Sequence, residues 1–195
     1  AKATIGYQHL KTSDNPSQLI KDIPLLQIDL SAIAKGYAVD RVATLIDERG
    51  IQNYLVEIGG EIKVRGLNPK AENWQIAIEK PIIDSSANKK QIAHQIIPLE
   101  NIAVATSGDY HNYFEEKGVR YSHTLDPKTG KPVTHQLASV TVLHESAMMA
   151  DGYATAIMVL GDKKGLAFAK KEGLQVLMLV RDKDKFITLS TLRDE

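Results

Sequence analysis

The segment spanning residues 28–40, with the sequence IDLSAIAKGYAVD, brings together a carboxylate (Asp29), a hydroxyl (Ser31) and an ammonium group (Lys35). Apolar residues recur at helical spacing from 34 to 49, which predicts that a helix begins inside this segment, after a short apolar strand. The free N–H groups and the positive dipole of a helix N-terminus can bind a phosphate or another anion, with Lys35 as a counter-charge. An ordinary strand-to-helix turn, with Asp29 or Ser31 as a cap and a solvated lysine, is the alternative interpretation.

A second pair of polar side chains lies in the segment 147–160, which the apolar pattern also predicts to be a helix. Asp151 and Thr155 are four residues apart, so their side chains share one helix face. A carboxylate and a hydroxyl suit a hard cation, and an ion with only two protein ligands keeps waters or shares substrate phosphates, which is typical of magnesium. A polar helix face without a ligand is the alternative.

His123 precedes Asp126-Pro127 in a turn-rich segment away from any apolar face, a position that suits a general base. A surface histidine without a function is the default for any single histidine. The other five histidines show no ligand spacing with it, so a histidine metal site is not expected. They are His9, His94, His111, His135 and His144.

Two glycine-containing segments, 106–108 and 59–61, could let the backbone approach a ligand closely. Glycines are also common in hairpin turns, and neither segment matches a Walker or Rossmann fingerprint.

The order of the expected elements favours an α+β fold with a mixed or largely antiparallel sheet, because runs of strands are joined by few crossover helices. The expected strands cover 5–10, 25–30, 54–58, 62–65, 74–78, 92–97, 102–106, 138–143, 174–180 and 185–189, with a turn-rich connection at 12–17, a loop at 81–90, a hairpin over 113–121 and a further helix at 163–171.

A weak internal repeat links the segments 35–38 (KGYA) and 151–154 (DGYA). Each lies near the start of an expected helix that is followed by a glycine, a strand, a turn and a second strand. Four shared letters can arise by chance. If the repeat reflects an internal duplication, the two segments would be related by pseudo-symmetry and could face one another across a cleft.

Composition is typical of a globular protein: 195 residues, of which 43% are hydrophobic and 25% charged, suffice for one large domain. The 24 basic residues balance the 24 acidic ones, so no charge-driven binding to nucleic acid or to an anionic membrane is expected. The chain contains no cysteine, which excludes disulfides, thiolate metal sites and a cysteine nucleophile. No apolar run approaches the roughly 18 to 20 residues of a membrane span.

Five sequence blocks in this order resemble the signature blocks of the ApbE family: DLSAIAKGYAVD, YLVEIGGEI, VATSGDY, SHTLDPKTGKPV and ADGYATA. The resemblance covers nearly the whole chain. It implies a magnesium-dependent FAD:protein FMN transferase, which splits FAD, attaches FMN through a phosphoester to a threonine of a target flavoprotein and releases AMP. A pyrophosphatase that gives FMN and AMP, or a flavin-binding module without turnover, is the alternative.

The resemblance also assigns roles to single residues. It implies that Ala32 (through its carbonyl), Asp151 and Thr155 bind the metal and that His123 is the catalytic base. The residues that it implies in FAD binding are Asp29, Lys35, Ser107, Gly108 and Leu125.

Members of the family are usually longer, so residues 1–195 resemble one domain that forms the C-terminal portion of such an enzyme. The N-terminal portion carries further FAD contacts, and we expect it to be a partner that full FAD affinity requires. Many members also carry a signal peptide with a lipid-modified cysteine. The resemblance therefore implies an extracytoplasmic, periplasmic protein that is lipid-anchored to the inner membrane at full length.

Overall fold

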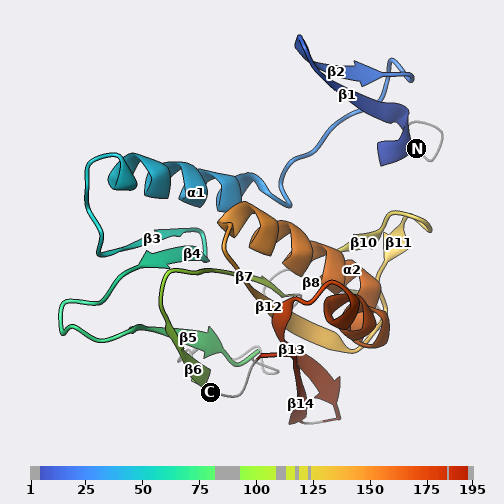
Figure 1. The fold of residues 1–195 in the computed structure, drawn as a ribbon. Coiled ribbons are helices and arrows are strands. Elements are labelled where there is room, and N and C mark those ends of the chain that lie inside the picture. Colours follow the sequence, from blue (N-terminus) through green and yellow to red (C-terminus); the bar gives the residue numbers. More distant parts are fainter. Residues whose placement is uncertain are drawn as a thin grey trace.

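The computed structural model describes residues 5–81, 93–108, 113–116, 119–122, 124–183 and 185–192, with the backbone alone for 113–116 and 119–122. Within these ranges, a six-stranded sheet carries two long helices on one face (Figure 1). The helices are α1 (Ala34–Asp47) and α2 (Ala147–Lys171).

The central sheet has the strand order β14-β13-β12-β7-β4-β3, and each neighbouring pair is antiparallel. The predicted α+β class with a largely antiparallel sheet is thus confirmed. The strands are β3 (Tyr54–Ile58), β4 (Glu61–Arg65), β7 (Ala103–Gly108), β12 (Leu137–His144), β13 (Gln175–Asp182) and β14 (Lys185–Ser190).

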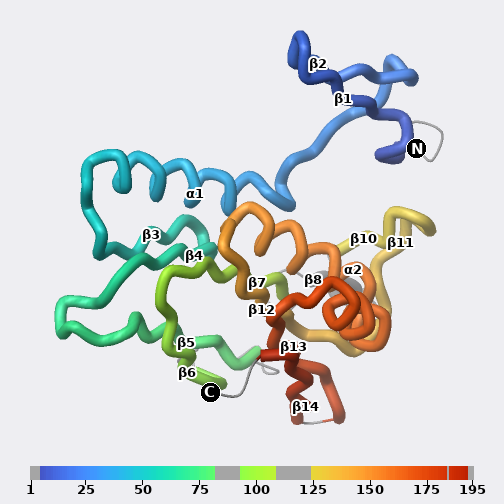
Figure 2. The backbone as a smooth tube through the Cα atoms, viewed as in Figure 1, coloured from blue at the N-terminus to red at the C-terminus, as the bar shows by residue number. Residues whose placement is uncertain are grey.

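Four antiparallel two-stranded ribbons surround the sheet. They pair β1 (Leu10–Asp14) with β2 (Ser17–Lys21), β5 (Trp74–Glu79) with β6 (Ala93–Leu99), β8 (Tyr113–Glu116) with β9 (Val119–Ser122), and β10 (Leu125–Asp126) with β11 (Lys131–Pro132). The ribbon of β1 and β2 stands away from the body of the molecule, at the blue end of the backbone (Figure 2).

The core lies on both faces of the sheet because alternate residues of its central strands point in opposite directions. In β13, Val176 and Met178 pack in the cluster that includes residues of α2, whereas Leu177 and Leu179 pack with residues of β5 and β6. Seven of the eight residues of β12 are buried, as expected for a strand covered on both sides. Helix α1 packs on β3 and β7 through Val39 and its neighbours.

The predicted strand at 25–30 is wrong, because this segment has no regular structure. Leu26 is buried, but Leu25, Ile28 and Leu30 are exposed. The apolar pattern resembles a strand, yet no described strand pairs with this connection between the β1–β2 ribbon and α1 (Figure 2).

The N-terminal expectations also need correction. Residues Tyr7–His9 form a 3-10 turn, and the strand predicted at 5–10 instead begins at Leu10. Most of the connection predicted at 12–17 belongs to β1 and β2, whose turn is formed by Asn15 and Pro16.

The two helices predicted at 147–160 and 163–171 are the two parts of α2, which is broken at Gly161. Gly161 has a φ of 78°, a left-handed conformation that favours glycine. The His135 ring packs against this glycine, and its Nε2 donates a hydrogen bond of 2.6 Å to the carbonyl of Met158. His135 therefore supplies a hydrogen-bond donor to a carbonyl of α2 next to the break. The other expected strands, including the hairpin at 113–121, are found within two residues of their predicted ends. The loop predicted at 81–90 lies almost wholly outside the described residues.

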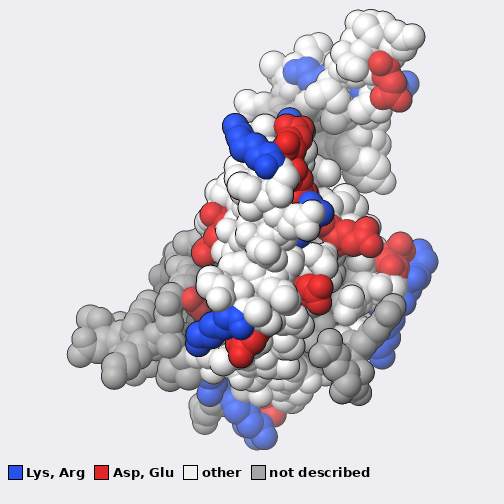
Figure 3. Space-filling view, turned by 60° about the vertical axis from the view of Figure 1, so that its left-hand side comes forward, with Lys and Arg blue, Asp and Glu red and all other residues white. Residues whose placement is uncertain are grey.

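Acidic and basic side chains are interspersed on the face shown in Figure 3, with uncharged surface between them. This pattern agrees with the balanced charge of the chain. Within the described ranges, neither helix has the length and apolar character that a membrane crossing requires.

Candidate active site

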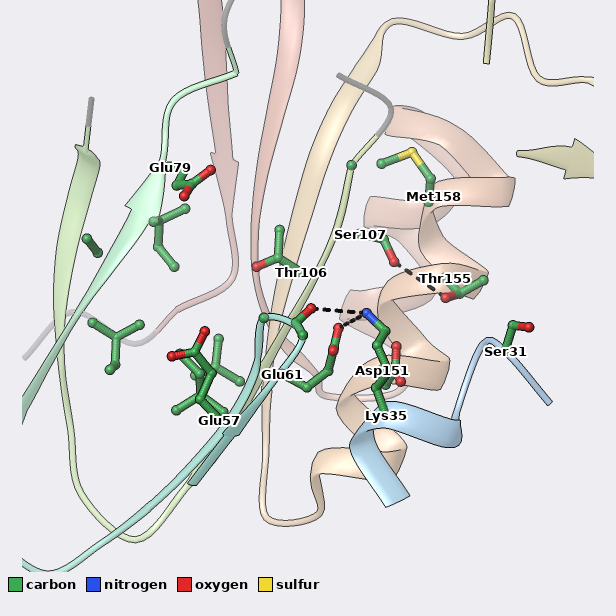
Figure 4. A pocket seen from close by; sticks show the side chains of 18 of the residues that line it. Ser31, Lys35, Glu57, Glu61, Glu79, Thr106, Ser107, Asp151, Thr155 and Met158 are labelled. Atoms are coloured by element: carbon green, nitrogen blue, oxygen red, sulfur yellow. Dashed lines mark hydrogen bonds and ion pairs between the residues drawn. The ribbon is translucent and has the colours of Figure 1, made fainter. Parts of the chain in front are cut away.

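A cavity of about 540 Å³ lies where the first turn of α1, the β3–β4 turn, β5, β7 and α2 meet (Figure 4). Five segments that are distant in the sequence thus contribute to one site. Among the described residues it is lined by Ser31, Lys35, Glu57, Gly59, Gly60, Glu61, Ile62, Ile76, Ala77, Ile78, Glu79, Val104, Thr106, Ser107, Gly108, Thr124, Asp151, Thr155 and Met158.

Asp151 is a buried carboxylate on α2, with 4% of its surface exposed. Its Oδ2 accepts a hydrogen bond of 3.1 Å from the backbone N–H of Gly36, in the first turn of α1. First-turn N–H groups have no partner inside their own helix, so Asp151 satisfies one of them from a second helix. Oδ1 has no hydrogen-bond partner among the described residues, which leaves it available to a ligand.

The contact between α1 and α2 depends on Gly36. A Cβ atom built on Gly36 would lie 2.2 Å from the carbonyl oxygen of Ala147 and 2.6 Å from its carbon. Both are backbone atoms that cannot turn aside. A side chain at position 36 would therefore push the helices apart and move Asp151 away from its N–H donor.

Asp40 anchors the start of α2 to α1. Its Oδ1 accepts from the N–H of Ala147 at 3.1 Å, and its Oδ2 accepts from the N–H of Met148 at 3.0 Å and from the Ser146 hydroxyl at 2.7 Å. Lys63 donates to Oδ1 at 2.7 Å. A carboxylate is thus placed at the positive end of α2, one turn before Asp151. Burial alone would raise the pKa of Asp40, but Lys63 and the three donors outweigh burial and hold this pKa below its usual value.

Lys35 extends along the cavity and donates to Glu61 Oε1 at 2.7 Å and to the carbonyl of Gly59 at 3.4 Å. Glu61 is almost completely buried, whereas the Lys35 side chain is 46% exposed. The second oxygen of Glu61, Oε2, is buried without a hydrogen-bond partner in the described part of the chain. Figure 4 shows the Lys35 ammonium beside Glu61, with the Asp151 carboxylate close to the Lys35 stem.

Two hydroxyls complete the wall next to Asp151. Thr155 Oγ1 and Ser107 Oγ lie 3.4 Å apart (Figure 4), and Thr155 is one turn after Asp151 on α2. Thr106 Oγ1 is 2.8 Å from Thr141 Oγ1. Carboxylate and hydroxyl oxygens from two elements thus face the same space.

The charge of the cavity is predominantly negative. Its described lining contains four carboxylic residues and one ammonium group. Burial raises the pKa of Asp151, against the opposing effects of the Gly36 N–H and of Lys35. Burial also raises the pKa of Glu61, which Lys35 lowers and Asp151 raises further. The site thus stabilises a cation and disfavours a bare anion.

The donor set fits a magnesium ion that the protein surrounds only in part. Hard oxygen donors are present in Asp151 and Thr155, and magnesium prefers such donors and commonly keeps waters or substrate phosphates. The described residues contain no cluster of three or more His, Cys, Asp or Glu side chains that could hold a metal ion. A ligand that brings its own phosphate oxygens would complete the coordination.

Of the nine residues predicted for the site, five line this cavity: Lys35, Ser107, Gly108, Asp151 and Thr155. Asp29, Ala32 and Leu125 are not among the lining residues, although their neighbours Ser31 and Thr124 are. His123 lies outside the described residues. The roles of these nine residues stay predictions.

Asp29 does not cap α1, whose N-cap residue is Ile33 without a side-chain hydrogen bond. Its carboxylate accepts from the Ser31 hydroxyl and from the Ser31 N–H, the latter at 2.7 Å. These donors lower the pKa of Asp29, which is fully exposed. The alternative interpretation of Asp29 or Ser31 as an ordinary cap is therefore wrong, and the polar pair closes a turn before the helix.

Glu61 is the principal site residue that the sequence did not reveal as functional. The sequence places it after two glycines at a hairpin turn, where a glutamate is normally solvated. Its burial and its ion pair with a lysine 26 positions earlier arise only from the tertiary fold.

Known proteins resemble this chain over most of its length. Residues 1–178 match the model of the ApbE family. The chain belongs to the ApbE family. A relative named FAD:protein FMN transferase, from Vibrio cholerae, is 50% identical over 185 residues, which are 95% of this chain and 53% of that protein. A second, from Haemophilus influenzae, is 45% identical over 93% of this chain and 51% of its own length.

Solved ApbE structures share the fold. The apo form of the Pseudomonas stutzeri flavinyl transferase ApbE superposes with a TM-score of 0.84 at 46% identity, over 97% of this chain and 56% of that one. Flavin transferase ApbE from Vibrio cholerae also gives a TM-score of 0.84, over 97% of this chain and 58% of that one. The ApbE chain described here thus spans about half the length of the relatives that it matches.

Proposed function

We propose that residues 1–195 form the C-terminal domain of an FAD:protein FMN transferase. The observation that carries this proposal is the meeting of Lys35, Asp151 and Thr155 at one cavity in a chain of the ApbE family. Relatives that carry the transferase name support it at up to 50% identity.

The charge of the cavity supports a requirement for magnesium. A pyrophosphate is anionic, and four carboxylic residues in the described lining would repel it. A divalent cation bound by Asp151 and Thr155, with the Ala32 carbonyl as a further proposed ligand, would neutralise pyrophosphate charge in the site. Lys35 supplies the one ammonium group of the described lining for the remaining phosphate charge.

In the proposed reaction, the hydroxyl oxygen of an acceptor threonine attacks the phosphorus of the FMN half of FAD. The bond from this phosphorus to the AMP oxygen breaks, so FMN becomes a phosphoester of the target protein and AMP leaves. His123 would take the hydroxyl proton. Asp29, Ser107, Gly108 and the backbone near Leu125 would orient the flavin nucleotide, because phosphoryl transfer depends chiefly on positioning and charge stabilisation.

The full-length protein would be periplasmic and lipid-anchored to the inner membrane, where it would modify a flavoprotein with an acceptor threonine. This part of the proposal rests on the family alone. Fractionation of cells that produce the full-length protein would test it.

Incubation of the full-length protein with FAD, magnesium and a target domain that contains an acceptor threonine tests the activity. Flavin fluorescence on the target in a denaturing gel, together with AMP release, is expected. A target with valine in place of the threonine, and a sample with a chelator, serve as controls. Free FMN and AMP without labelled target would indicate a pyrophosphatase, and unchanged FAD would indicate a binding module.

A further inference from the structure

The ion pair between Lys35 and Glu61 joins the first turn of α1 to the start of β4. Its 2.7 Å separation is that of a charge-assisted hydrogen bond, and Glu61 is only 2% exposed. The Gly59 carbonyl accepts a second, longer bond from the same ammonium. Without these contacts, a lysine side chain that is 46% exposed would lose little by turning into solvent.

The carboxylate of Glu61 is costly to bury and is not fully satisfied. Oε2 has no hydrogen-bond partner among the described residues, and the nearby Asp151 carboxylate raises the energy of a second negative charge. Glu61 lines the cavity, with one oxygen paired with Lys35 and the other without a hydrogen-bond partner among the described residues.

We propose that Glu61 is the positioning residue for Lys35: it holds the ammonium inside the cavity, where the ammonium binds a phosphate of a flavin or adenine dinucleotide. The ammonium can turn toward a bound phosphate and still contact the carboxylate. This inference rests on the proposed function, because the phosphate belongs to the proposed FAD substrate.

The proposal and simple electrostatics predict opposite changes in FAD affinity when the charge of Glu61 is removed. A negative charge beside a phosphate site repels the ligand, so its removal should tighten binding if charge alone matters. If Glu61 positions Lys35, its removal should weaken binding, because the ammonium is then free to leave the cavity.

The test measures FAD binding by calorimetry in magnesium, using the full-length protein and its Glu61→Gln, Lys35→Met and doubly substituted variants. We expect Glu61→Gln to weaken binding about tenfold, in keeping with one charge-assisted hydrogen bond to the ligand. In the Lys35→Met background, Glu61→Gln should cause less than about a twofold loss, since the two residues act as one unit. Thermal unfolding of each variant confirms that it is folded.

Glu57→Gln is the matched control, because Glu57 lines the same cavity but is not paired with Lys35. It should tighten FAD binding slightly. Tighter binding in Glu61→Gln as well, or equal losses with and without Lys35, would overturn the inference. Direct manganese binding without FAD adds a further check: if Glu61→Gln weakens it in both backgrounds, Glu61 is a metal ligand and the inference is wrong.

The two proposals fail differently. Absence of FAD binding by the unsubstituted protein would overturn the proposed function together with this inference. Normal FAD binding that Glu61→Gln does not weaken would overturn the inference alone. If Glu61→Gln does not fold, the ammonium resonance of Lys35 in the unsubstituted protein decides: a shift on addition of FAD and magnesium supports the inference, and no shift contradicts it.

Discussion

The segments 35–38 and 151–154 differ only in their first residue, and they lie against one another in the fold. Lys35 is an accessible cation at the mouth of the cavity, whereas Asp151 is an anion buried beside it. Each leads through a helix and a glycine to a strand hairpin, as the sequence predicted. The two segments are in direct contact, whereas the sequence suggested that they could face one another across a cleft if they arose by duplication.

The hairpins that follow the two helices occupy opposite edges of the central sheet. On the α1 side the second strand, β4, is the inner one; on the α2 side the first strand, β13, is the inner one. The two units therefore do not occupy equivalent positions in the sheet. An origin by duplication stays a prediction.

The glycines and tyrosines of the two segments also differ in environment. A Cβ atom on Gly36 would meet the backbone of Ala147, whereas a Cβ atom on Gly152 would meet only the Ile33 side chain, at 3.2 Å. Tyr37 is 54% exposed, whereas Tyr153 packs against the core. The comparison teaches that the same residues at matching positions of two helices can have different roles. The elements around each helix decide which glycine must lack a side chain and which tyrosine packs in the core.

The largest effect is expected from Asp151→Asn. The substitution keeps the shape and removes the buried carboxylate that we assign to the cation, so magnesium-dependent transfer should fall about 1,000-fold or more, in keeping with several kcal/mol of lost charge stabilisation. Asp162→Asn, beyond the break in the same helix, is the control and should leave turnover unchanged. Steady-state rates at several magnesium concentrations measure the effect; wild-type rates at limiting magnesium would remove Asp151 from the site.

Gly36→Ala should give the next largest effect. The added methyl group meets the Ala147 carbonyl at 2.2 Å, so the helices must separate, at a cost of about 3 kcal/mol in unfolding free energy. Gly152→Ala meets a movable side chain and should cost less than about 1.5 kcal/mol, most of it recovered through helix propensity. Urea unfolding compares the two. Equal losses would show that the close approach at Gly36 is not required.

Tyr153→Ala should destabilise the fold by about 2 kcal/mol, because its ring lies 5.8 Å from that of His144 and 6.1 Å from that of Phe168. Tyr37→Ala, at the matching position of α1, should change stability by less than about 0.5 kcal/mol. A large loss of stability at Tyr37, measured by thermal unfolding, would mean that this exposed ring is covered in the full-length protein.

Asp40→Ala should have a smaller effect, about 1 to 2 kcal/mol at neutral pH, through loss of the cap on α2. The pKa of Asp40 is lowered in the folded protein, so its contribution to stability is fully present above the unfolded pKa of about 4 and is lost as the pH falls through the lower folded pKa. Urea unfolding at pH 7, 5 and 3.5 should therefore show a stability difference between wild type and variant that is the same at pH 7 and 5 and begins to narrow at pH 3.5. A difference that does not narrow there would contradict the role assigned to the ionised carboxylate.

Local features of the site could be predicted from the sequence because they depend on spacing along one element. Asp151 and Thr155 lie four residues apart on a helix, and both line the cavity. The helix expected at 34–49 is found at Ala34–Asp47, since its apolar spacing and the glycine after it are local signals.

Features that depend on distant neighbours could not be predicted. The apolar residues at 25–30 have no partner strand among the residues that the structure describes, and sequence alternation does not reveal whether such a partner exists. Glu61 is buried and pairs with Lys35, a residue of another element that lies 26 positions earlier in the sequence. The alternative interpretation of Asp29 as a cap was wrong for a similar reason, because the first-turn N–H of Gly36 is satisfied by a residue 115 positions later.

The central claim is that Asp151 on α2 and Lys35 on α1 form one site for a cation and a pyrophosphate. Electron–nuclear double resonance with manganese in place of magnesium tests it most directly, in the full-length protein with FAD. We predict bound manganese with ³¹P hyperfine coupling from FAD in the wild type, and loss of the bound manganese in Asp151→Asn. Manganese that binds Asp151→Asn as tightly as the wild type, or that shows no ³¹P coupling, would contradict the account.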